Sequence, residues 1–126
     1  MLRTIAIIFG ILFLIAGVLG FYPAYSPDGQ LLGYFMINPM HNLVHIITGI
    51  VALWVGFTSA HASKIFFKVF GVIYVLVALL GLYYGEHAIF GLIANNMADV
   101  GLHFVVGIIA LFLGFGCCCS SSCKTG

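Results

Sequence analysis

The sequence contains very little charge. Only 6% of its 126 residues are charged, whereas 63% are hydrophobic. Because a typical soluble domain contains about 25% charged residues, this composition excludes a soluble globular protein. The formal net charge of +1 also excludes the strongly basic surface of a nucleic-acid-binding protein. The chain has the length of one compact domain.

Cysteine is absent from the first 116 residues, and the four cysteines all lie near the C-terminus: Cys117, Cys118, Cys119 and Cys123. Cysteines gathered at one end cannot cross-link a fold, and adjacent cysteines rarely have the geometry of a disulfide, so a disulfide framework is excluded. We interpret residues 117–126 as a Cys- and Ser-rich cytoplasmic tail. Its thiols could be acylated, could bind a soft metal or could simply stay reduced.

Catalytic motifs are absent as well. The sequence has no nucleophile elbow, P-loop, dinucleotide-binding fingerprint or zincin signature. The three acidic residues, Asp28, Glu86 and Asp99, are scattered along the chain. No paired-carboxylate site is therefore expected, and an enzyme is not favoured.

Long apolar runs are what the sequence does contain. An apolar helix needs about 20 residues to cross a bilayer, and four runs come close to that length, at about 4–22, 39–59, 65–84 and 97–115. The first run is too long for the apolar region of a signal peptide, and no clear cleavage site follows it. We predict an all-α, multi-pass membrane domain over residues 1–116, in contact with the lipid bilayer.

The few charges are segregated between the two sides of the predicted bundle. The basic residues fall before the first span, at the turn between the second and third, and after the fourth: Arg3, Lys64, Lys68 and Lys124. The acids fall on the opposite side. By the positive-inside rule, both termini are expected in the cytoplasm.

The second and fourth spans are similar in sequence. The 13-residue segments that begin at His45 and His103 are identical at seven positions, at an offset of 58 residues. Upstream, Asn38 aligns with Asn96 and His41 with Asp99. We interpret this as a repeat of one hairpin, at about 4–59 and 65–115. The predicted fold is a four-helix bundle with a pseudo-twofold axis along the membrane normal.

Small residues recur at helical spacing in both similar spans. They share one helix face with the histidines, and they are Gly49, Ala52 and Gly56, then Gly107, Ala110 and Gly114. Small residues allow helices to approach closely in a membrane. The simplest prediction packs these two faces together along the pseudo-twofold axis.

Four ionisable residues lie at the outer end of the two faces: His41, His45, Asp99 and His103. Asn38 and Asn96 precede these helices as expected N-cap residues. Ionisable groups inside a membrane are costly and usually have a partner. Three imidazoles and a carboxylate suit zinc or another divalent transition metal. Haem is a weaker alternative, because helices packed through glycine leave little room for a porphyrin.

Other interpretations of these four residues remain open. The histidines and Asp99 could only fix helix packing in a structural or accessory membrane protein. They could also belong to a proton or small-solute path. The small-residue faces could join two protomers, so a homo-oligomer or another membrane-protein partner is a further alternative.

The motif Asn-Pro-Met-His-Asn-Leu-Val-His from Asn38, together with Ala-Asp-Val-Gly-Leu-His that ends at His103, resembles a family of small, mainly bacterial membrane proteins. The family is catalogued as domain of unknown function four-three-eight-three. The resemblance extends from about Arg3 to Phe115. It implies a four-helix bacterial membrane protein, which we expect in the inner membrane, and it implies no activity.

Overall fold

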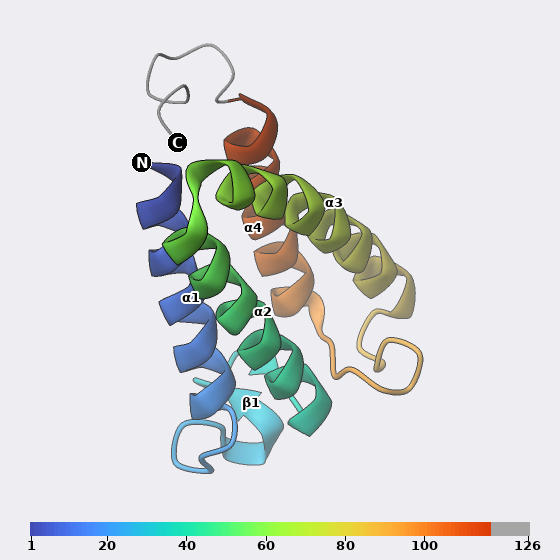
Figure 1. Ribbon diagram of the computed structural model, residues 1–126. Helices are drawn as coiled ribbons and strands as arrows, with labels where there is room; N and C mark the ends of the chain where they lie inside the picture. Colours follow the sequence, from blue (N-terminus) through green and yellow to red (C-terminus); the bar gives the residue numbers. More distant parts are fainter. Residues whose placement is uncertain (117–126) are drawn as a thin grey trace.

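The computed structural model describes residues 1–116, which form four long helices (Figure 1): α1 (Leu2–Leu19), α2 (Pro39–Thr58), α3 (Ala60–Tyr84) and α4 (Met97–Phe115). Each helix is long and apolar enough to cross a membrane. The prediction of an all-helical membrane protein with four spans is therefore confirmed. The predicted tail, with its four thiols, lies outside the described residues.

The two ends of the bundle differ. The N-terminus lies near the turn between α2 and α3, where the Arg3 side chain donates hydrogen bonds to the carbonyl groups of Gly56 and Phe57. The connections from α1 to α2 and from α3 to α4 lie together at the opposite end (Figure 1). We call these the turn end and the loop end.

Within each hairpin, the helices approach so closely that a methyl group has no room. A Cβ added at Gly49 of α2 would lie 2.8 Å from the carbonyl oxygen of Gly10 in α1. A Cβ at Gly114 of α4 would lie 2.6 Å from the backbone nitrogen of Lys68 in α3. Glycine on both facing helices permits this approach, and we call these contacts the hairpin seams.

The predicted packing of the second helix on the fourth is therefore wrong. Helix α2 pairs with α1, and α4 pairs with α3. The reason is that α1 and α3 have glycines of their own, Gly10 and Gly71, which face α2 and α4. The six small residues of the two predicted faces are all buried: Gly49, Ala52, Gly56, Gly107, Ala110 and Gly114.

Aromatic rings fill the space between the two hairpins. Phe9 of α1 lies edge-on to Phe67 and Phe70 of α3, with centroids 5.8 Å and 4.8 Å apart. Phe67 is fully buried, and Phe70 stacks on Tyr74 at 3.9 Å. Such pairs add packing energy to the contact between helices, so α3 joins the two hairpins through its aromatic face.

The connections at the loop end contain two similar tight turns. Strands β1 (Gln30–Leu31) and β2 (Phe35–Met36) pair in the first connection, where the 3-10 turn η1 (Pro27–Gly29) comes just before β1. In the second connection, Ile89 pairs with Ile93. Both turns contain a bulky residue and then a glycine at positive φ, which are Leu32–Gly33 and Phe90–Gly91. Glycine accepts this backbone conformation without strain.

Side-chain amides tie each connection to the other hairpin. Asn38, the N-cap of α2, donates to the carbonyl of Leu92 at 2.8 Å. Asn96, the N-cap of α4, donates to the carbonyl of Tyr34 at 2.8 Å. Reciprocal hydrogen bonds from the N-cap residues of α2 and α4 therefore hold the loop end together.

Candidate metal centre

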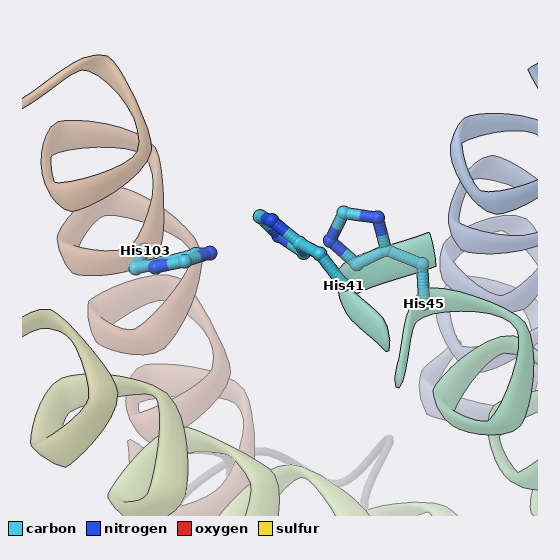
Figure 2. Close-up of side chains that lie close together, drawn as sticks. All are labelled: His41, His45 and His103. Atoms are coloured by element: carbon cyan, nitrogen blue, oxygen red, sulfur yellow. The ribbon is translucent and has the colours of Figure 1, made fainter. Parts of the chain in front are cut away.

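Three histidines converge between the hairpins near the loop end. His41 and His45 lie one turn apart on α2, and His103 reaches toward them from α4 (Figure 2). The ring of His41 lies between the other two, with centroids 4.6 Å from His45 and 6.0 Å from His103. Each ring offers one ligand nitrogen, and these three nitrogens lie within 4.8 Å of one another. We call this group the histidine triad.

The backbone fixes the position of His41. Its main-chain N–H donates to the side chain of Asn38 at the helix start, at 2.8 Å. Its Nδ1 lies 3.0 Å from the carbonyl oxygen of Met36. Because a carbonyl only accepts, Nδ1 carries the proton, and Nε2 of a neutral ring is left with its lone pair. The carbonyl of Ala94 is a second polar neighbour of this ring.

Each of the other two rings has a nitrogen without a hydrogen-bond partner in the described part of the chain. Nδ1 of His45 and Nδ1 of His103 are buried without a hydrogen-bond partner among residues 1–116. Buried polar atoms are nearly always paired, and an exception calls for an explanation such as an unseen ion. Phe13 lies edge-on to His45 at 5.4 Å, and Tyr74 lies edge-on to His103 at 5.2 Å. These aromatic walls surround the triad with apolar surface.

Asp99, the fourth predicted ligand, has other partners. One carboxylate oxygen, Oδ2, accepts from the main-chain N–H of Asn96 at 3.0 Å and from that of Met36 at 3.1 Å. The first bond completes the capping box of α4, and the second joins α4 to the first connection. The structure thus brings together three of the four predicted residues. The fourth, Asp99, instead bonds main-chain groups at the loop end.

The geometry of the triad suits a small divalent ion. Zinc takes imidazole nitrogens at about 2.0–2.1 Å, so ligand nitrogens around a tetrahedral zinc lie roughly 3.3 Å apart. The three nitrogens lie within 4.8 Å of one another, so they would have to approach by at most about 1.5 Å to reach that spacing. Three protein ligands leave the fourth position open, as in catalytic zinc sites.

A groove of about 550 Å³ runs between α2 and α3 and ends at the triad. His41 and His103 form part of its wall at the loop end, and Val55 and Ala62 line it toward the turn end. Tyr74 also lines the groove, and its hydroxyl group is hydrogen-bonded to Thr48. Most of the remaining wall is apolar.

Fold and site together define a small four-span membrane protein with a histidine triad between its hairpins. The chain belongs to the family described as Domain of unknown function (DUF4383), whose model matches residues 3–116. This confirms the resemblance seen in the sequence. No curated protein shows significant similarity to the chain, and no solved structure does either.

The aromatic face of α3, of which Tyr74 lies beside His103, was not predicted from the sequence. Phe67, Phe70 and Tyr74 recur at steps of three and four residues, which places them on one helix face. This spacing could have identified an inward face of α3. The buried Asn95, which donates to the carbonyls of Gly81 and Gly85, was missed as well, because a single asparagine in a loop carries no pattern.

Proposed function

We propose that this protein is a membrane metal-binding protein in which His41, His45 and His103 hold one divalent transition-metal ion between the two hairpins. The observation that carries the proposal is the convergence of three ligand nitrogens from two helices within 4.8 Å. The unpartnered Nδ1 atoms of His45 and His103 and the carbonyl that fixes the His41 ring support it. Imidazole ligands suit zinc, copper, iron and nickel.

The environment of the triad favours an ion over three unliganded rings. His41 and His103 are almost completely buried, at 2% and 6% exposure. A buried lone pair without a donor loses its hydration and receives nothing in return. The hydrogen bond from His41 to Met36 is also the contact that usually orients a metal-bound histidine.

The test is elemental analysis of protein purified in mild detergent without a metal-binding tag. We expect about one metal ion per chain, and we expect its loss in the double variant His45→Ala/His103→Ala. The matched control is His61→Ala/His87→Ala, which removes two exposed histidines and should keep the ion. Metal-free wild-type protein that also fails to bind added zinc, cobalt or copper would overturn the proposal.

A structural role for the polar cluster is the second candidate. It is favoured by Asp99, whose carboxylate holds backbone groups of both hairpins, and by the reciprocal bonds of Asn38 and Asn96. On this view the whole cluster fixes the loop end and the triad binds nothing. Elemental analysis separates the two candidates. Only a metal site predicts an ion that is present in the wild type and lost in His45→Ala/His103→Ala.

We also propose that the hairpins are copies of one unit related by a pseudo-twofold axis. Three features support this, at an offset of 58 residues except that Gly10 corresponds to Gly71 at an offset of 61. The two tight turns correspond, as do the reciprocal bonds of Asn38 and Asn96. The seam contacts correspond too, since Gly10 faces Leu53 as Gly71 faces Leu111.

The sidedness of the protein is part of the proposal. We place both termini in the cytoplasm and the loop end, with the triad, at the outer face of a bacterial inner membrane. The segregation of the basic residues from the acids supports this orientation. In a variant whose four tail cysteines are replaced by serine, Tyr34→Cys, at a residue of the first connection that is 71% exposed, should react with an impermeant thiol reagent in intact cells. Labelling only after lysis would reverse the orientation.

A further inference from the structure

The groove between α2 and α3 connects the triad with the lipid-facing surface. We infer that the metal ion takes the carboxylate of a long-chain fatty acid at its open position, while the acyl chain lies along this groove. The inference rests on the proposed metal site and names its ligand. Two properties of the groove support this inference. One end of the groove is polar, and most of the remaining wall is apolar.

The polar end of the groove coincides with the triad. His41 and His103 belong both to the triad and to the wall of the groove. A molecule in the groove would therefore lie beside two of the three residues that would hold the ion. Thr48 and Tyr74 also line this region, and they offer hydroxyl groups near a bound head group.

The length of the groove suits a single acyl chain. Its wall on α2 runs from His41 to Val55, which corresponds to roughly 21 Å at 1.5 Å per residue. Its volume of about 550 Å³ lies within the range of about 300–1,000 Å³ for small-molecule sites. Ile65 and Val69 line the groove and are 48% and 53% exposed, so the groove opens sideways toward the bilayer.

Charge favours an acid over a neutral amphiphile. A divalent ion bound by three neutral imidazoles keeps its full positive charge, and an unpaired charge in an apolar surrounding is costly. Within residues 1–116, no carboxylate or thiol joins the three histidines as a fourth ligand, and Asp99 is engaged by backbone groups. An anionic head group from the membrane would reduce this charge and complete the coordination.

The test uses cobalt(II), whose visible spectrum reports its ligands, bound to the protein in nanodiscs of neutral phosphatidylcholine. Palmitate should change the cobalt bands at a concentration at least roughly tenfold below that of acetate, which has the same head group without a chain. The methyl ester of palmitic acid, which keeps the chain and lacks the charge, should leave the spectrum unchanged.

A variant with a blocked groove tests whether the acyl chain lies there. Val69→Trp should fill the groove, keep cobalt binding and lose the preference for palmitate over acetate. Val105→Trp is the control, because Val105 on α4 is equally exposed at 55% and does not line the groove. It should behave as the wild type.

The outcomes separate the inference from the proposed function. If cobalt binds but palmitate acts no better than acetate, or if the ester acts as well as palmitate, the fatty-acid inference is overturned and the metal site stands. The same conclusion follows if Val69→Trp keeps the preference, because partitioning of palmitate into the bilayer then explains it without the groove. If cobalt does not bind to the triad at all, the proposed function fails and the inference fails with it.

Discussion

The hairpin seams and the contact between the hairpins are built in different ways. In the seams, glycine brings two backbones together, and a Cβ at Gly49 or Gly114 would lie under 3 Å from main-chain atoms of the neighbouring helix. Between the hairpins, aromatic rings and side-chain amides make the contact, and a groove of about 550 Å³ remains. The seams leave no space for a ligand, whereas the contact between the hairpins does.

The histidine triad follows this division. Two of its members come from one hairpin and one from the other, and the groove leads to them. Helices in a bilayer gain little from burying apolar surface, because lipid is equally apolar. Contacts between the hairpins therefore depend on rings, hydrogen bonds and, in our proposal, a metal ion.

The largest effect is expected from filling a seam. Gly49→Leu should prevent the native fold of the first hairpin, because even its Cβ would lie 2.8 Å from the Gly10 carbonyl. We expect loss of cooperative thermal unfolding in detergent. Gly101→Leu is the control, since a Cβ at Gly101 meets nothing within 4 Å. Equal stability of the two variants would contradict the close seam.

Removing the carboxylate of Asp99 should have an intermediate effect. Asp99→Ala leaves the main-chain N–H groups of Met36 and Asn96 without their acceptor, which should lower the free energy of unfolding by about 1–3 kcal/mol. Metal content should not change, because Asp99 is outside the triad. Glu86→Ala removes a single exposed bond, from the main-chain N–H of Met97, and should cost less than Asp99→Ala. Loss of the metal in Asp99→Ala would make Asp99 a ligand after all.

The two N-cap asparagines should have similar and smaller effects. Asn38→Ala and Asn96→Ala each remove a cap, worth about 1 kcal/mol, together with a bond to the other hairpin. Ser59→Ala removes the cap of α3, which accepts from Ala62 within the same helix, and should cost less. The comparison uses chemical unfolding of all three variants. A smaller loss in either asparagine variant than in Ser59→Ala would argue against the ties between the hairpins.

Much of the fold could be predicted from the sequence. Length and apolar character give the four spans, and Asn38 followed by Pro39 marks the start of α2. Helix α3 begins at Ala60, five residues before the predicted start at 65. Ser59 caps it directly after α2, so polar residues at the turn belong to the helix, and hydropathy alone does not show this.

The pairing of the helices could not be predicted from one face alone. The small residues of α2 and α4 suggested a direct contact, but they pack on the preceding helices, where Gly49 meets Gly10 and Gly114 meets Lys68. Three of the four predicted site residues nevertheless converge, because their depth in the helices is fixed by the N-caps. The role of Asp99 depends on the position of the Met36 amide in the first connection, which sequence spacing does not describe.

The most direct test of the account is the effect of zinc on thermal unfolding, with His103 as the single ligand from the second hairpin. At free zinc about 100-fold above its dissociation constant, the wild type should gain about 2.7 kcal/mol of stability. His87→Ala should gain as much, and His103→Ala should gain almost nothing at the same zinc concentration. A wild type that zinc does not stabilise, or a His103→Ala variant stabilised as strongly as the wild type, would contradict a metal centre shared by the two hairpins.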